Sequence, residues 1–218
     1  MSLIPYLNFI DYFLPMVFNV IAVINQLTQE NKLLKVTDNP PMTWPDEKSI
    51  DDFSGLWWVA HTKSRNEKAL AHHLVSKNIS YFLPMNWKVR RTRGRTIRSL
   101  LPLFGGYLFF CGNENQRLEV LRTNRVANLI EVRDQTRLIK ELLQIQNALQ
   151  AGAPLIPHKY IEAGRRCRVI AGPLADLQGV VVKTKGVTRL ILQIDMLGQA
   201  ASVEIELDMI EPLDETKP

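Results

Sequence analysis

The chain has 218 residues, 46% of them hydrophobic and 22% charged, which is ordinary for one or two globular domains and excludes a disordered or fibrous chain. The formal net charge is +5, and its distribution is uneven. Residues 1–54 carry a net charge of −4, residues 55–150 carry +10 and residues 151–218 carry −1. The positive excess lies in the middle of the chain, so we expect a polyanion or an acidic protein surface as the neighbour of that part only.

The two cysteines, Cys111 and Cys167, lie far apart and have no metal-ligand spacing, so neither a disulfide framework nor a zinc site is indicated. We expect both to be buried apolar side chains in a reducing compartment, and the protein to be cytoplasmic. No Ser, His and carboxylate arrangement, phosphate-binding glycine loop or metal-ligand cluster stands out. We therefore expect no enzyme activity, no cofactor and no metal.

The first 54 residues combine an apolar stretch with a proline-rich stretch. Val17, Ile21 and Ile24 recur at helical spacing, but Pro15 interrupts the run before it reaches the ~20 apolar residues of a spanning helix. We expect an N-terminal helical extension packed on the body or on a partner, followed by a linker over residues 37–52. A peripheral membrane contact and a start codon assigned too far upstream are the alternatives.

The first domain is expected at residues 55–150. Ser64 and Glu67 have the spacing of a capping box at the start of its first helix. The predicted elements are a strand at 56–61, a helix from 64 to 78, strands at 79–89 and 96–101, an aromatic strand up to 110, a helix at 114–122, a strand at 126–132 and a helix at 136–150. This order predicts an α+β sandwich with helices packed on an antiparallel sheet.

The central feature of this domain is the segment PLFGGYLFF, which begins at Pro102 and is rich in aromatic residues. Alternation along a strand places Tyr107 and Phe109 on one face of the sheet and Phe110 on the other. The rings therefore serve either as the core of a strand covered on both sides or as anchors of a binding face. The pattern alone fits both interpretations.

A basic segment precedes the aromatic one and contains no acidic residue. Its cations alternate with Val89, Thr92 and Ile97 around Gly94, as expected for two strands joined by a tight turn. The cations are Lys88, Arg90, Arg91, Arg93, Arg95 and Arg98. We expect a basic hairpin, with a solvated charged loop as the alternative.

After a linker at residues 151–162, marked by Pro154 and Pro157, the chain has only strand-like segments. They lie at about 166–170, 179–184, 189–196, 200–206 and 209–212, separated by glycine-containing turns. Short strands punctuated by turns predict a small closed barrel over residues 163–214.

Two parts of the chain resemble domains of a known family. The segment from Gly164 to Val182 resembles the KOW motif, because the frame V-x-x-G-P-x-x-x-x-x-G-x-V fixes Gly172, Pro173 and Gly179 together. Residues 57–112 resemble the NGN domain that precedes KOW in the NusG family of transcription elongation factors. The two resemblances together cover residues 55–214.

Within the NGN resemblance, the segment from Pro102 to Phe109 is closer to the P-L-F-P-x-Y-L-F pattern of RfaH-type specialised paralogues than to the F-P-G-Y-V of the housekeeping factor. Gly105 stands where these relatives usually have proline, so we expect a looser local turn. The resemblance implies an NGN α/β sandwich followed by an SH3-like KOW β-barrel. It also implies a transcription elongation or antitermination factor.

In the family, the NGN domain binds the clamp helices of the largest subunit of RNA polymerase through an apolar pocket. The resemblance implies the same contact here, through the matching aromatic positions. These positions are Phe104, Tyr107 and Phe109, with Trp57 or Trp58 at the border. The core interpretation of the rings stays open beside this one.

In such factors another NGN face lies beside the transcription bubble and, in RfaH-like members, contacts exposed non-template DNA. The cations of the basic hairpin would then contact phosphates. Candidates for contacts with unstacked bases lie around the first helix, and they are Lys63, Arg65, His72 and His73. A solvated helix face is the alternative for the two histidines.

The relatives use the KOW domain to bind a small-subunit ribosomal protein or Rho. Leu174, Ile194 and Leu197 are the candidates for this docking face, with the core of the barrel as the alternative. The β-favouring runs 180–182 and 190–192 favour a permanent barrel over the helical hairpin of RfaH. We expect a monomer. The alternative function is a KOW-containing ribosome- or RNA-binding protein without polymerase contact.

Overall fold

The computed structural model describes residues 39–46, 49–92, 94–160, 164–184 and 186–213. The N-terminal helix predicted from the apolar stretch lies outside the described residues, as does Arg93 of the basic segment. The two cysteines are buried and free, as predicted.

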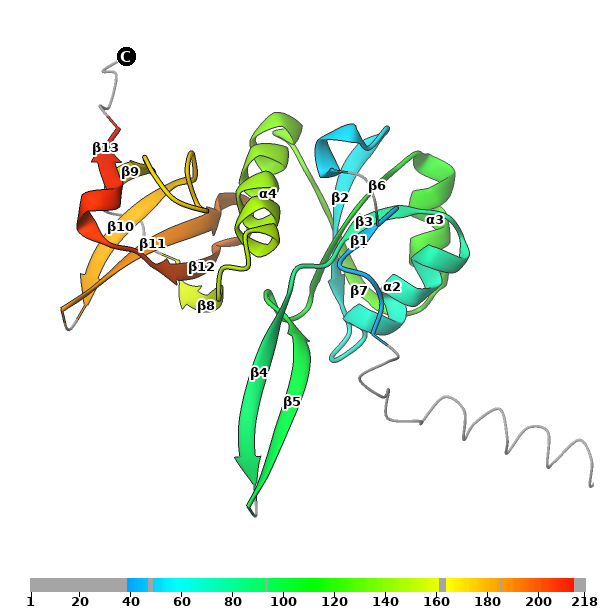
Figure 1. The fold of residues 1–218 in the computed structure, drawn as a ribbon. Coiled ribbons are helices and arrows are strands. Elements are labelled where there is room, and N and C mark those ends of the chain that lie inside the picture. The colour runs from blue at the N-terminus through cyan, green and yellow to red at the C-terminus, as the bar shows by residue number, and fades with distance from the viewer. Residues whose placement is uncertain (1–38, 47–48, 93, 161–163, 185, 214–218) are drawn as a thin grey trace, which may run out of the picture. The chain divides into compact units, whose positions relative to one another are not determined.

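The first sheet has five strands in the order β1-β3-β6-β2-β7, and every neighbouring pair is antiparallel (Figure 1). The strands are β1 (Thr43–Trp44), β2 (Leu56–Thr62), β3 (Ser80–Phe82), β6 (Tyr107–Gly112) and β7 (Val126–Glu131). The predicted aromatic strand therefore lies in the middle of the sheet, as β6.

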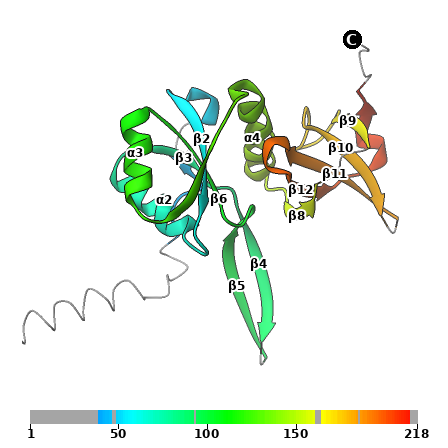
Figure 2. The same cartoon turned by 180° about the vertical axis from the view of Figure 1, so that it is seen from behind.

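Helices cover both faces of this sheet. They are α2 (Glu67–Ser76), α3 (Glu114–Arg122) and α4 (Gln135–Gln150). Figures 1 and 2 show α2 and α3 together on one side of the sheet and α4 on the other. Alternate residues of β6 pack accordingly, because Leu108 and Phe110 lie in one core cluster with Leu74, and Phe109 lies in another with Leu142. The predicted α+β arrangement is confirmed for this part of the chain.

The sheet begins earlier than predicted. Strand β1 pairs with β3, and the short helix η2 (Ile50–Asp52) buries Ile50 completely. The side-chain oxygen of Gln146 on α4 accepts hydrogen bonds from the Ser49 hydroxyl (3.2 Å) and the Ile50 amide (3.3 Å). The described part of the predicted linker therefore belongs to the first domain. Strand β1 and helix η2 are too short to show any periodicity in the sequence, so the sequence did not predict them.

The start of α2 also differs from the prediction. The N-cap residue is Asn66, and its side chain makes no capping hydrogen bond. Glu67 is buried, and its Oε1 accepts a hydrogen bond of 2.7 Å from the amide of Gly106, in the turn before β6. The capping box predicted for Ser64 and Glu67 is therefore wrong. The carboxylate connects α2 to the aromatic strand instead.

The basic segment forms a hairpin of β4 (Met85–Thr92) and β5 (Arg95–Pro102), which is a separate two-stranded sheet. Figures 1 and 2 show it extending beyond the rest of the domain. Two side chains hold its root, because Lys68 donates to the carbonyl of Leu100 and Asn86 donates to the carbonyl of Leu155. The hairpin interpretation of the sequence is confirmed.

The C-terminal sheet is antiparallel, with six strands in the order β13-β9-β10-β11-β12-β8. The strands are β8 (Ile156–Lys159), β9 (Arg165–Val169), β10 (Gln178–Thr184), β11 (Val187–Ile194), β12 (Gln199–Glu204) and β13 (Ile210–Pro212). The five predicted strands are present. The additional strand β8 lies within the predicted linker and pairs with β12.

Helix α4 also contacts this sheet. Arg137 forms an ion pair with Asp195, and the Gln144 side chain accepts a hydrogen bond of 2.9 Å from the amide of Gln178. Burial raises the pKa of Glu141, although Arg137 acts in the opposite direction. One helix is therefore packed between the first sheet and the C-terminal sheet.

The contact between Glu67 and Gly106 makes a prediction about stability. Glu67→Ala leaves the partly buried Gly106 amide without its acceptor, so the free energy of unfolding should fall by ~1–3 kcal/mol. Urea denaturation measures this change. Ser64→Ala is the matched control and should have a smaller effect. A larger loss for Ser64→Ala would instead indicate that the hydroxyl caps the helix.

Candidate functional site

Three of the four rings predicted to bind polymerase are buried. The exposed fractions of Trp57, Phe104 and Phe109 are 1%, 2% and 0%. Phe104 meets Phe109 edge-on at 6.3 Å, and Phe53 stacks on Trp57 at 5.7 Å. In this structure the three rings are core residues of the face that α4 covers, not an exposed surface. Sequence alternation separates the two faces of β6, but it does not show that α4 covers the face with Phe109. It therefore did not distinguish these outcomes.

The fourth ring, Tyr107, is partly exposed and stacks on the exposed ring of His61. The ring centroids are 5.2 Å apart, and the planes differ by 27°. The two residues are opposite one another in β6 and β2, and a register shift follows His61 in its pairing with β7. We call His61 and Tyr107 the aromatic pair. Sequence patterns did not indicate this pair, because the pairing depends on strand register.

The turn before β6 fixes the position of this pair. Gly106 has a φ of +84°, a conformation that glycine adopts without strain. Its carbonyl accepts a hydrogen bond of 2.8 Å from Thr62, and its amide donates to Glu67. The turn is therefore held from β2 and α2 at once.

A hollow of about 700 Å³ adjoins the same end of the sheet. Its lining includes Asn128, Ile130 and Leu138, and Asn128 is opposite His61 in the neighbouring strand. Ile130 is a partly exposed apolar residue of this lining, Leu138 is buried beneath it, and charged side chains such as Glu131 and Arg133 make up much of the rest. Among the four rings predicted to bind polymerase, only Tyr107 at this end of the sheet is accessible.

The basic hairpin presents its described cations to solvent. Lys88, Arg90, Arg91, Arg95 and Arg98 are all exposed. No acidic residue occurs in β4 or β5, and within the described ranges none of these cations forms an ion pair. A surface with unpaired cations on both strands attracts polyanions.

A second basic group lies where two loops meet. The Lys63 amide donates to the carbonyl of Arg125 (2.8 Å), and the Lys63 ammonium donates to Asn124 (2.6 Å). Arg125 in turn donates to the Asn66 side chain (3.2 Å). The exposed Arg65 lies between Lys63 and Asn66 in the chain. The structure thus adds Arg125 to the predicted residues. It lies far from them in sequence, which is why the sequence did not indicate it.

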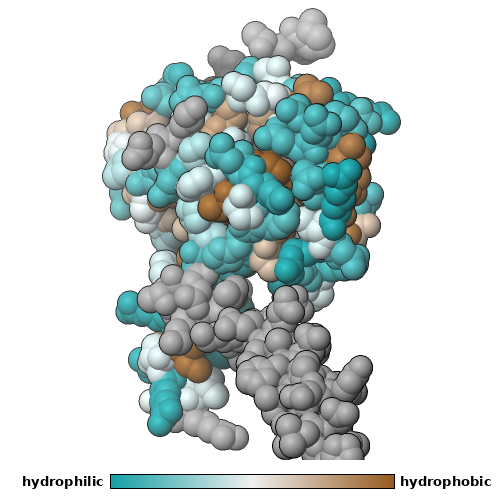
Figure 3. All heavy atoms as spheres, turned by 90° about the vertical axis from the view of Figure 1, so that its right-hand side faces the viewer, coloured by the Kyte–Doolittle hydropathy of each residue, from teal (hydrophilic) through white to brown (hydrophobic). Residues whose placement is uncertain are grey.

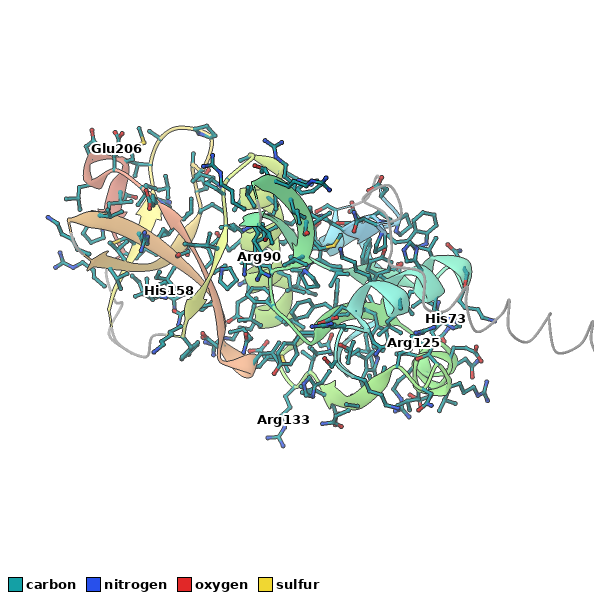
Figure 4. All side chains as sticks on the ribbon, turned by 90° about the horizontal axis from the view of Figure 1, so that it is seen from below. His73, Arg90, Arg125, Arg133, His158 and Glu206 are labelled. Carbon is teal, nitrogen blue, oxygen red and sulfur yellow. The ribbon has the colours of Figure 1, made fainter. Side chains whose placement is uncertain are left out.

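His73 borders this second group, and Figure 4 shows it beside Arg125. Its Nε2 is buried and has no hydrogen-bond partner among the described residues. Burial lowers the pKa of His73, and the nearby charges of Lys77 and Arg125 lower it further, while Glu119 opposes them. A neutral imidazole therefore faces two cations. His72, its neighbour on α2, is exposed.

The face formed by α2 and α3 is mostly hydrophilic, with scattered hydrophobic side chains (Figure 3). Arg117 lies 5.3 Å above the ring of Trp58 and pairs with Glu114. Leu118 and Leu121 are exposed on α3. Scattered apolar residues of this kind are normal on a protein surface.

The residues predicted to dock a partner on the C-terminal sheet are not gathered at one place. Ile194 is fully buried, so it is a core residue. Leu197 is half-buried in the short helix η3 (Asp195–Leu197). Leu174 lines a hollow of about 660 Å³ together with Leu207, which is 57% exposed, and with Glu204 and Glu206 at its edge.

The first sheet, with helices on both faces and a cationic hairpin, defines a mixed α/β domain that presents aromatic and basic side chains. The family model described as "Transcription termination factor nusG" matches residues 55–148, from before β2 to near the end of α4. This match supports membership of the NusG family. No curated protein matches the chain significantly. Within the described ranges, each helix is too short or too polar to cross a membrane.

The environment of His73 makes a prediction about pH. Because folding lowers its pKa from the ordinary 6.5, the unfolded chain binds a proton more readily, and stability should fall as the pH drops below about 6.5. His73→Gln should reduce this acid sensitivity in urea denaturation series at pH 5 to 8. His72→Gln, an exposed position on the same helix, is the control. An unchanged pH profile for His73→Gln would contradict the account.

Proposed function

We propose that the protein is a transcription elongation and antitermination factor that binds RNA polymerase through the domain at residues 55–150. The single observation that carries this proposal is the family match over β2, the helices and the basic hairpin. NusG-family proteins generally bind RNA polymerase. The similarity of the segment from Pro102 to Phe109 to RfaH-type paralogues supports a specialised factor that acts on particular operons.

The aromatic pair and the neighbouring hollow are the proposed contact with the clamp helices of the largest polymerase subunit. His61 and Tyr107 present stacked, accessible rings, and the partly exposed Ile130 is an apolar neighbour in the hollow. A few aromatic anchors of this kind supply most of the free energy of an interface, at ~2 kcal/mol or more each. Phe104 and Phe109 act beneath them as the rigid support.

The two basic groups are the proposed contacts with DNA at the transcription bubble. The exposed cations of the hairpin suit contacts with phosphates. Such contacts do not depend on the base sequence of the DNA. Lys63, Arg65 and Arg125 provide a second set of donors beside α2. Binding to both surfaces at once would position the domain on polymerase and on DNA.

The C-terminal sheet is proposed to be a KOW module that docks a small-subunit ribosomal protein or Rho. The G-P and G-x-V positions of the KOW frame fall at the turn after β9 and in β10. The hollow with Leu174 and Leu207 offers an apolar floor, and Glu206, an exposed carboxylate in its lining, suits a basic partner.

Binding to polymerase tests the proposal directly. The double substitution His61→Ala and Tyr107→Ala should weaken binding of the purified chain to core RNA polymerase by at least about tenfold, because two anchors are lost. Leu121→Ala, an exposed position on α3, is the control and should bind as the wild type does. Circular dichroism checks that the double variant is folded. Biolayer interferometry with immobilised polymerase measures the affinity.

Phe109→Asp is unsuitable for this purpose, because its ring is fully buried and a charge there would unfold the domain. Wild-type affinity in the folded double variant would contradict the proposed contact. Failure of the wild-type chain to bind polymerase, together with sedimentation with ribosomal particles, would favour the alternative of a ribosome- or RNA-binding protein.

The proposed phosphate contacts predict a salt dependence. The plot of log affinity against log salt concentration for a DNA oligonucleotide should have a negative slope, and Arg90→Gln with Arg95→Gln should reduce its magnitude by ~1.4 for a single strand. Titrations between 50 and 300 mM salt measure it. Arg133→Gln is the control, because Arg133 is an exposed cation outside both basic groups that Figure 4 shows pointing away from the fold. An equal reduction for the control would indicate non-specific attraction.

A further inference from the structure

The two faces of the basic hairpin carry different side chains. Residues paired across antiparallel strands point to the same face, and so do alternate residues along one strand. Trp87 is opposite Leu100, and Val89 is opposite Arg98. Arg91 follows on the same face at the next alternate position. One face therefore carries Trp87 and Val89 beside the two guanidinium groups of Arg91 and Arg98.

Trp87 is unusually exposed for its residue type. Its exposed fraction is 51%, against 1% for Trp57. The neighbouring Val89 is 56% exposed. A single exposed aliphatic side chain needs no explanation, but an exposed indole on a strand, flanked by cations, is a surface suited to a flat apolar group.

A hollow of about 510 Å³ lies at the root of the hairpin, and Trp87 lines it. We call it the root hollow. Its other walls come from β1, β3 and the end of α4. The apolar lining residues are Met42, Phe82, Met85, Leu149, Ala153 and Pro154. Polar side chains also line the root hollow, and they are Thr43, Asn86, Gln146 and Gln150.

The charge of the hairpin selects the kind of occupant. Its strands contain no acidic residue, so the face with Trp87 carries unopposed positive charge. A polyanion that also exposes flat aromatic groups satisfies both the cations and the indole. Single-stranded nucleic acid has this chemistry, whereas a duplex keeps the faces of its bases inside the stack.

We infer that this face binds single-stranded DNA, with an unstacked base lying on the indole of Trp87 at the mouth of the root hollow. Arg91 and Arg98 contact the phosphates of the flanking nucleotides. The inference rests on the proposed function, which places the hairpin at the exposed DNA strand of the bubble. It adds a base-stacking residue to a surface otherwise assigned only to phosphates.

The test uses the purified full-length chain and a fluorescently labelled oligo(dT) strand, without polymerase. Trp87→Ala should weaken binding by about 5- to 150-fold, the range for one stacked base, and should leave the salt slope unchanged. Trp87→Phe should retain most of the affinity because a ring remains. Arg91→Gln should reduce the salt slope by ~0.7.

Ile97→Ala is the matched control, because Ile97 lies on the other face of the same hairpin with a similar exposure of 50%. It should bind oligo(dT) as the wild type does. Fluorescence anisotropy measures all affinities, and circular dichroism of Trp87→Ala checks the fold. A loss in Trp87→Ala that exceeds the loss in Ile97→Ala supports the inference.

Several results would overturn it. One is an affinity of Trp87→Ala equal to that of the wild type or of Ile97→Ala. Equal or tighter binding of a duplex would exclude stacking on an unpaired base, and equal or tighter binding of the matching RNA strand would overturn the assignment to DNA. Binding to anionic lipid vesicles that depends on Trp87, with no such dependence for oligo(dT), would assign the face to a membrane. Failure of polymerase binding leaves this test unaffected, so the two proposals fail separately.

Discussion

The burial of β6 between two layers of helices is the constraint on which the rest of the first domain depends. Leu108 and Phe110 pack towards α2 and α3, and Phe109 packs towards α4. All three are fully buried. The strand cannot rotate or slip without exposing these side chains, so the turn before it is held in place. The turn positions Tyr107, which follows it, and the root of the hairpin, which precedes it.

The two proposed contacts lie on either side of the turn that precedes β6. The aromatic pair lies where β2 and β6 are paired, at the first residue of β6. The hairpin ends at Pro102, just before the turn that leads into β6. Apolar rings suit a protein partner, and unpaired cations suit DNA. A domain that presents both is suited to a factor that holds a polymerase and a nucleic acid together.

Local patterns predicted much of the fold. The hairpin, α4 and the strands from β9 to β13 were visible in the sequence because each has its own periodicity. Strand β1 was not, because Thr43 and Trp44 are stabilised only by pairing with β3. Glu67 was assigned to its own helix end, but its partner Gly106 lies 39 residues away. The exposure of Trp87 and the burial of Phe104 depend on tertiary packing, which alternation does not reveal.

Site-specific photo-crosslinking from position 61 to transcribing RNA polymerase tests the central claim most directly. A photoreactive residue in place of His61 should crosslink to the clamp helices of the largest subunit, and one in place of Leu121 on α3 should not. Crosslinks from position 61 only to other subunits, or none to polymerase in a chain that remains bound, would contradict the assignment of the aromatic pair as the polymerase contact.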